Sequence, residues 1–170
     1  MSRLTVALMV VAMLALASVA CGQGYFGQVY DDDAYKAWQV RAGYYDLGDL
    51  GSDLGFGADY MARDWMASAD YVTTSAFGND FDIWSLSGTY LKRMAGKPGT
   101  YYGAGAGWYD LSANGNSDDS VGYHVLFGME FGSPDQFGEP AWIAQARYVF
   151  GTDLGGGDID GFQASLGRRF

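Results

Sequence analysis

The stretch Thr100–Leu111 reads TYYGAGAGWYDL, and two of its aromatic residues, Tyr102 and Trp108, stand six positions apart. Because six is an even number, both rings lie on the same face of a β-strand. That face carries Ala104 and Ala106 between the rings, whereas the opposite face carries only glycine there. The stretch therefore predicts a strand with one apolar face that ends in aromatic rings and one bare face.

The same spacing occurs three more times along the chain. The pairs are Trp38 and Tyr44, Trp65 and Tyr71, and Trp142 and Tyr148. Small or apolar residues lie between the rings on their own side, and polar or charged residues occupy most of the other side. An apolar band between two aromatic girdles, opposite a polar face, is typical of strands in a β-barrel that spans lipid.

Eight segments with strand-like alternation cover the chain from residue 37 onward. They span residues 37–46, 53–61, 65–74, 81–91, 100–110, 120–131, 141–151 and 158–170. Each is close to the ~9–11 residues that a tilted strand needs to cross a bilayer. We predict an all-β fold over residues 37–170, an eight-stranded antiparallel up-and-down transmembrane β-barrel.

The N-terminal segment predicts export. An apolar run over residues 4–17 is followed by Ser-Val-Ala at 18–20, the small-x-small pattern of a signal-peptidase site. We expect a signal peptide over residues 1–20 and a short polar lead-in over residues 21–36. Cys21, the only cysteine, follows the predicted cut. Two interpretations of it stay open, a lipidated cysteine and an ordinary residue near a cleavage site.

The net charge of the chain excludes some classes of partner, and the distribution of charge among the connections predicts the orientation of the barrel in the membrane. Lys and Arg number 10 against 20 Asp and Glu, a net charge of −10, which excludes nucleic acid as a partner. The connections after odd-numbered segments contain no Lys or Arg, and most basic residues outside the strands follow even-numbered segments. Both chain ends lie with the second class, so we expect that class on the periplasmic side and the acidic loops outside the cell.

The last segment carries an apolar stripe that ends in Phe170. Together with TYYGAGAGWYDL, this ending resembles the small eight-stranded outer-membrane barrels, the group containing the membrane domains of outer membrane proteins A and X and the opacity proteins. The resemblance covers roughly residues 37–170. It implies a location in the bacterial outer membrane, contact with outer-membrane lipids, and insertion by the barrel-assembly machinery, with Phe170 as part of the signal that this machinery reads.

Six charged residues fall on the polar face of the predicted strands. An eight-stranded barrel is just wide enough for side chains to fill it, and an unpaired buried charge costs several kcal/mol. Alignment of the strands on their aromatic pairs places Asp70 and Arg147 at a similar height. We expect a salt-bridge plug, with an ion-conducting path as the alternative. The six residues are Arg41, Asp59, Asp70, Glu130, Arg147 and Arg169.

His124 is the only histidine, and Asp118, Asp119 and Ser120 precede it closely. A hydroxyl, an acid and a histidine are the parts of a hydrolase or an acyl transferase, but they act only within hydrogen-bond reach of one another. A histidine in a hydrogen-bond network of the lumen is the simpler interpretation. We therefore expect no enzymatic activity, no catalytic residue and no cofactor.

Aspartates gather in the four predicted exterior loops. Oxygen ligands separated by Gly and Asn suit Ca²⁺ or Mg²⁺, yet no twelve-residue calcium loop is present. Two alternatives stay open, divalent cations bound at this rim and solvated loops without metal. The residues are Asp46, Asp49, Asp53, Asp80, Asp82, Asp110, Asp118, Asp119, Asp153, Asp158 and Asp160.

Three functions fit the pattern. The first is a non-enzymatic outer-membrane barrel with a structural or surface-interaction role and a lumen plugged by charged side chains. The second is a narrow pore for ions or small solutes. The third is a soluble lipocalin-like ligand carrier, in which the apolar faces would point inward. The oligomeric state and the partner of the loops do not follow from the pattern.

Overall fold

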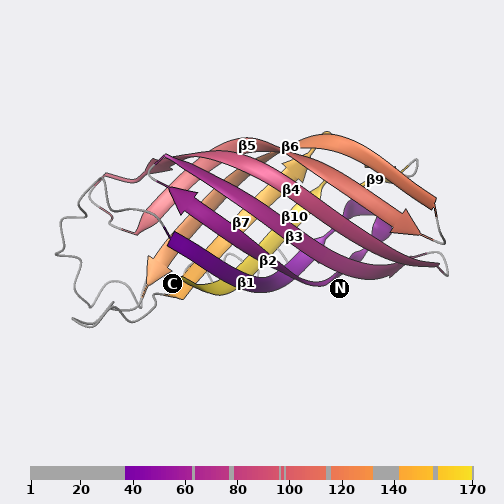
Figure 1. Cartoon of the computed structure of the whole chain (residues 1–170), viewed down its shortest axis with the longest axis horizontal. Helices are drawn as coiled ribbons and strands as arrows, with labels where there is room; N and C mark the ends of the chain where they lie inside the picture. The colour runs from indigo at the N-terminus through magenta and orange to yellow at the C-terminus, as the bar shows by residue number, and fades with distance from the viewer. Residues whose placement is uncertain are drawn as a thin grey trace.

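Eight long antiparallel strands close into one barrel in the computed structural model, which describes residues 37–62, 64–76, 79–95, 97, 99–113, 116–131, 142–154 and 157–169 (Figure 1). Each long strand pairs with the next one along the chain, and the last pairs with the first. The predicted eight-stranded antiparallel fold is confirmed. The strands are β1 (Ala37–Asp46), β2 (Ser52–Ala62), β3 (Trp65–Ala76), β4 (Asn79–Arg93), β5 (Thr100–Ala113), β6 (Asn116–Phe131), β7 (Trp142–Phe150) and β10 (Gly161–Arg169).

Pairing extends several strands beyond their predicted ends at the acidic end of the barrel. β5 and β6 remain paired up to Ala113 and Asn116, in a polar stretch where the alternation of side chains gives no strand signal. Backbone hydrogen bonds do not depend on side-chain polarity, so a ladder continues until the chain turns. Within the described residues, no helix is long and apolar enough to cross a membrane.

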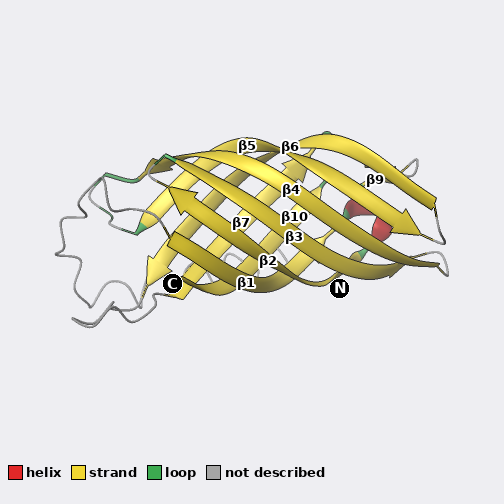
Figure 2. Ribbon diagram, in the orientation of Figure 1, coloured by secondary structure: helices red, strands yellow, loops and turns green. Residues whose placement is uncertain are grey.

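Two short features that the pattern does not predict lie at the same end. The predicted loop after the seventh segment contains a small hairpin of β8 (Asp153–Leu154) and β9 (Gly157–Asp158), and the last strand begins at Gly161 instead of at the predicted residue 158. The loop after β1 contains a 3-10 helix, η2 (Gly48–Leu50), visible in red in Figure 2. Elements this short show no period, and η2 begins at Gly48, whose φ of 60° favours glycine.

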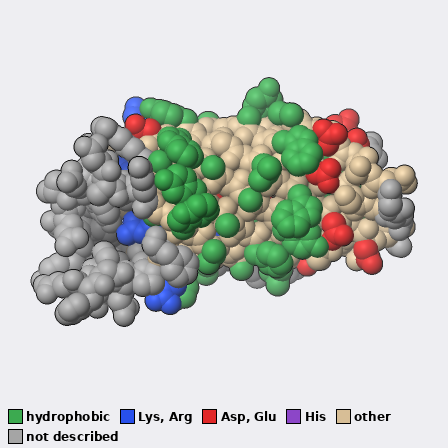
Figure 3. All heavy atoms as spheres, viewed as in Figure 1, with side chains coloured by type: hydrophobic (Ala, Val, Ile, Leu, Met, Phe, Trp, Pro, Cys, Tyr) green, Lys and Arg blue, Asp and Glu red, His purple; other side chains and the backbone are tan. Residues whose placement is uncertain are grey.

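The aromatic residues of the girdles lie on the outer face. Trp38 is 61% exposed, and Trp65, Tyr102, Trp108, Trp142 and Tyr148 are each at least 40% exposed, while Tyr44 and Tyr71 are partly exposed. On the face drawn in Figure 3, hydrophobic side chains gather in two bands, with acidic residues beyond one band and most of the basic residues beyond the other. Aromatic and apolar side chains on the outer face are typical of a transmembrane barrel.

Ring contacts join neighbouring strands within each girdle. Tyr60 lies between Trp38 and Trp65, with ring centroids 5.0 Å and 5.5 Å away. At the other rim, the centroid of Tyr71 is 4.6 Å from that of Trp84. Tilted aromatic pairs at these distances add about 0.5–1.5 kcal/mol beyond the burial of their area. Ring contacts thus run across β1, β2 and β3 in one girdle and across β2, β3 and β4 in the other.

The lumen is filled with side chains in three layers. Apolar clusters occupy both ends, and charged and polar residues lie between them. The expectation of a polar inner face is thus right only for the middle, because a lumen packed with side chains accepts apolar residues as well as polar ones. The end clusters comprise Tyr45, Leu47, Leu50, Val72, Ile83, Tyr109, Leu111, Val149, Leu154 and Ile159, and Met61, Met66, Leu91, Tyr101 and Leu126.

Candidate functional site

Four of the six predicted lumen charges form one chain of ion pairs across the barrel. Arg147 Nη1 lies 2.9 Å from Asp70 Oδ2, and Arg41 Nη2 lies 2.5 Å from Asp70 Oδ1. Arg41 also reaches Asp59, with Nε 2.9 Å from Oδ2. All four residues are at most 5% exposed. Two cations alternate with two anions, so this buried group has no net charge.

The Asp70–Arg147 ion pair spans the full width of the lumen. β3 carries Asp70 and β7 carries Arg147, and these strands face each other, with β4, β5 and β6 between them on one side and β2, β1 and β10 on the other. Side chains from opposite walls therefore meet at the centre.

Hydrogen bonds satisfy most of the remaining polar atoms of this ion network. The Tyr45 hydroxyl donates to Asp70 Oδ1 at 2.8 Å and accepts from Arg41 Nη1 at 2.9 Å. Arg147 Nη2 donates to Ser68 Oγ at 3.1 Å, and Gln39 Nε2 donates to Asp59 Oδ2 at 2.7 Å. Buried ion pairs repay their desolvation only when such additional bonds are made.

Gly57 keeps the space that the ion network needs. Gly57 lies on β2, where it pairs in register with Asp70 on β3 and with Arg41 on β1. A Cβ at this position would collide with Asp70 Oδ1 and with the Arg41 guanidinium. Gly57 does not stand out in the sequence, and the one signal for it is its position between two strands that carry inward charges.

Glu130 and Arg169 form a separate ion pair toward the basic end of the barrel. Arg169 Nη1 lies 2.5 Å from Glu130 Oε2. The pair connects β6 with β10, which are not adjacent because β7 lies between them. The six predicted charges are thus divided into a network of four and a pair of two.

His124 is buried, but the residues that precede it do not join it. Its Nε2 lies 2.8 Å from Thr89 Oγ1 on β4. Asp119 is exposed at the rim, where it accepts a hydrogen bond from Trp108 Nε1 at 3.0 Å. Five residues of extended strand separate Asp119 from His124 by about 17 Å. The hydroxyl, acid and histidine therefore do not form a catalytic arrangement.

The rim aspartates bind backbone groups of the loops. Asp160 Oδ1 accepts from Thr152 N at 3.1 Å, and Asp49 Oδ2 accepts from Asp158 N at 3.4 Å. Across the described ranges, no group of three or more His, Cys, Asp or Glu side chains is placed to hold a metal ion. The first bond lies within the segment that contains the β8–β9 hairpin, and the second connects this hairpin with the loop that contains η2.

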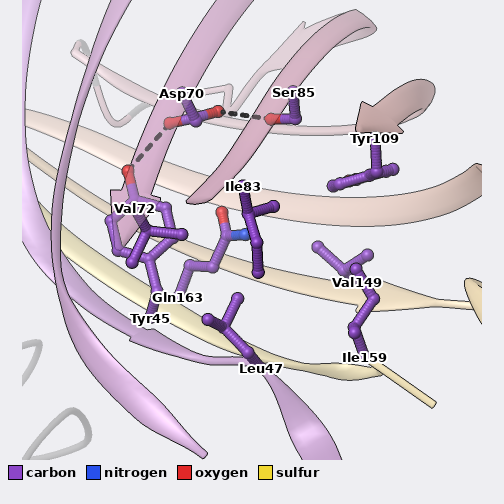
Figure 4. A pocket seen from close by; sticks show the side chains of 10 residues that line it. All are labelled: Tyr45, Leu47, Asp70, Val72, Ile83, Ser85, Tyr109, Val149, Ile159 and Gln163. Atoms are coloured by element: carbon purple, nitrogen blue, oxygen red, sulfur yellow. Dashed lines mark hydrogen bonds between the residues drawn. The ribbon is translucent and has the colours of Figure 1, made fainter. Parts of the chain in front are cut away.

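The two loops form an apolar cap inside the acidic mouth of the barrel. Leu47, Leu50, Leu154 and Ile159 are buried there against side chains from the barrel wall. Beneath the cap is a cavity with about 10 Å³ for the centre of a water molecule (Figure 4). It is lined by apolar residues together with Tyr45, Asp70, Ser85 and Gln163. This is room for about one water molecule.

We expect Leu154→Asp to open the cap and leave the barrel closed. Leu154 is fully buried, and a charge there is driven toward water because a buried unpaired carboxylate is costly. The measurement is limited proteolysis of the folded protein, with cleavage expected within residues 151–160 and an intact heat-modifiable barrel. Ser117→Asp, at an exposed residue of the polar rim, is the control. Resistance equal to that of the unmodified loop would contradict the cap.

Three predictions concern residues outside the described part of the chain. They are the signal peptide and lead-in over residues 1–36, the state of Cys21, and the role of Phe170.

Comparison with solved structures finds the same architecture. Neisserial surface protein A aligns with a TM-score of 0.59 and 21% identity, covering 79% of this chain and 94% of that chain. The attachment invasion locus protein of Yersinia pestis, solved in complex with the heparin analogue sucrose octasulfate, aligns with a TM-score of 0.47 and 17% identity, covering 79% of this chain and 99% of that one. No protein-family model and no curated protein match the sequence. The chain has the fold of the small eight-stranded transmembrane β-barrels, and the predicted resemblance is confirmed as one of fold.

Proposed function

We propose that the protein is a non-enzymatic β-barrel of the bacterial outer membrane with a structural or surface-interaction role, and that charged side chains close its lumen to solutes. One observation carries the second half of this proposal: Asp70 and Arg147 meet from opposite walls of the lumen at 2.9 Å. The outward aromatic girdles support the first half, because only a closed barrel satisfies its backbone in lipid without helices. Its proposed partners are outer-membrane lipids and the barrel-assembly machinery.

The outward face argues against a soluble ligand carrier. Such a carrier needs a polar exterior and an apolar chamber for its ligand. Here large apolar residues such as Trp38, Leu54 and Phe56 are more than 60% exposed, while the described cavity has room for only about one water molecule. A lipid environment accounts for the exposed apolar residues, and side chains that fill the lumen account for the small cavity.

Location is tested by cell fractionation combined with a heat-modifiability gel. We expect the protein in the outer-membrane fraction, with faster migration when the sample is not boiled, since a closed barrel stays compact in detergent. Recovery in a soluble fraction, or migration that does not change on heating, would overturn the proposed location and fold in the cell.

Closure of the lumen is tested by conductance in planar bilayers. We expect no steady open channels from the unmodified protein, and brief openings from Arg147→Ala, because that change removes one wall's contribution to the ion network while Arg41 still holds Asp70. Arg168→Ala, whose guanidinium lies over the outward Trp142 ring, is the control and should stay closed. Steady channels from the unmodified protein would replace the closed barrel with the narrow pore.

A further inference from the structure

A patch of glycine lies on the inner wall where β5 meets β6, and polar side chains cover it. Gly105 pairs with His124, and Gly107 pairs with Gly122. A Cβ added at Gly105 would stand 2.8 Å from His124 Nε2, and one added at Gly107 would stand 2.9 Å from Ser87 Cβ. The space that glycine leaves on this wall is therefore used by side chains of the neighbouring strands.

Tyr109 and Thr152 cover the same patch from the acidic end. Tyr109 Cε2 lies 3.2 Å from the Cβ position at Gly107 and 3.2 Å from the Cβ position at Gly122, and Thr152 Oγ1 crowds Gly122. Neighbouring inward positions on a strand are about 7 Å apart, so these side chains face one small region of the lumen. The four polar side chains on the patch are Ser87, Tyr109, His124 and Thr152.

One polar atom of each of these side chains has no hydrogen-bond partner among the described residues. The atoms are Ser87 Oγ, Tyr109 OH, His124 Nδ1 and Thr152 Oγ1. The four residues are at most 9% exposed, so bulk water does not reach these atoms. About 90% or more of buried polar groups in folded proteins bond to protein or to ordered water. Four such atoms on the side chains that cover one patch indicate a small polar ligand beside them.

We propose that this glycine patch is a hydration site that binds ordered water inside the barrel. Water both donates and accepts hydrogen bonds and uses 2–4 polar partners when buried. Three hydroxyl groups and one imidazole nitrogen supply both roles. The four side chains include no carboxylate for a metal cation and no arginine for an anion, so water is the ligand that fits. The lumen is then closed to solutes and wet beside its ion network.

The sign of a stability change tests the proposal. In Tyr109→Phe, loss of a hydroxyl bonded to water should lower the urea midpoint of unfolding, with the unfolding equilibrium constant rising roughly fivefold. If the Tyr109 hydroxyl has no bonding partner, its removal should raise the midpoint, because the folded protein no longer buries an unpaired polar group. A midpoint that is raised or unchanged therefore overturns the hydration site.

Two tyrosines serve as matched controls. The Tyr101 hydroxyl accepts a hydrogen bond from Gln145 Nε2 at 2.8 Å, so Tyr101→Phe gives the loss for a hydroxyl with a protein partner. Tyr123 is 56% exposed on the outer face, and Tyr123→Phe should leave the midpoint unchanged.

A second measurement uses the unmodified protein, so it does not depend on the folding of any variant. In lipid nanodiscs, NMR cross-relaxation at the water frequency should reach the ring protons of His124, as expected for a water molecule held inside the barrel. The absence of any such signal at His124 would overturn the proposal.

Discussion

Asp70→Asn is expected to lower the free energy of unfolding of the barrel by about 3–5 kcal/mol, the range for removing one partner of a buried ion pair. Asp70 accepts contacts from Arg41, Arg147 and Tyr45. Without its charge, Arg41 keeps Asp59, but Arg147 loses the only carboxylate within its ion-pair distance among the described residues. Asparagine keeps the volume of the side chain, so the loss reports charge rather than packing.

The measurement is urea unfolding of the protein in lipid vesicles, followed by tryptophan fluorescence. Asp153→Asn, at an exposed rim residue, is the matched control and should change the stability by less than about 0.5 kcal/mol. Combining Asp70→Asn with Arg147→Ala should cost less than the sum of the two single changes, since the second removes the stranded cation. Equal stability of Asp70→Asn and the unmodified protein would contradict the structural role of the ion network.

Deletion of Phe170 is expected to abolish most membrane insertion. β10 closes the barrel by pairing with β1 from Gln163 to Arg169, so assembly cannot finish until the last strand is in place. The resemblance to small outer-membrane barrels implies that Phe170 is part of the signal for that step. The measurement is the fraction of heat-modifiable protein in the outer membrane after expression in a bacterial host.

Phe170→Tyr is the control for the deletion, because it keeps an aromatic ring at position 170. It should insert almost normally, whereas Phe170→Ala should behave like the deletion. Normal insertion of the chain that lacks Phe170 would show that this residue does not carry the signal.

The barrel could be predicted from the sequence because its constraint is periodic. Lipid requires apolar side chains at every second position, and the spacing of Trp38 and Tyr44 repeats in three other strands. The same alignment brought Asp70 and Arg147 to one height, and the structure places them 2.9 Å apart. These features depend on strand direction and register, which the alternation of residues specifies.

The remaining contacts depend on side-chain reach and loop conformation, which have no period. Arg41 is the register partner of Gly57, yet its guanidinium contacts both Asp59 and Asp70. The cap arises where a loop with Gly48 at positive φ turns Leu47 and Leu50 into the mouth. Apolar residues in a Gly- and Asp-rich loop give a weak signal, because single exposed leucines are common.

We expect above all that the aromatic outer face of the closed barrel lies against lipid. All five tryptophans, Trp38, Trp65, Trp84, Trp108 and Trp142, are at least 40% exposed on the outer face. The most direct measurement is therefore quenching of tryptophan fluorescence by lipids brominated along their acyl chains, in vesicles that hold the folded protein. Contact of this face with lipid predicts strong quenching by bromines near the headgroups and weaker quenching by bromines at the bilayer centre, since the tryptophans lie in two girdles. Emission insensitive to brominated lipid, together with strong quenching by aqueous iodide, would contradict it.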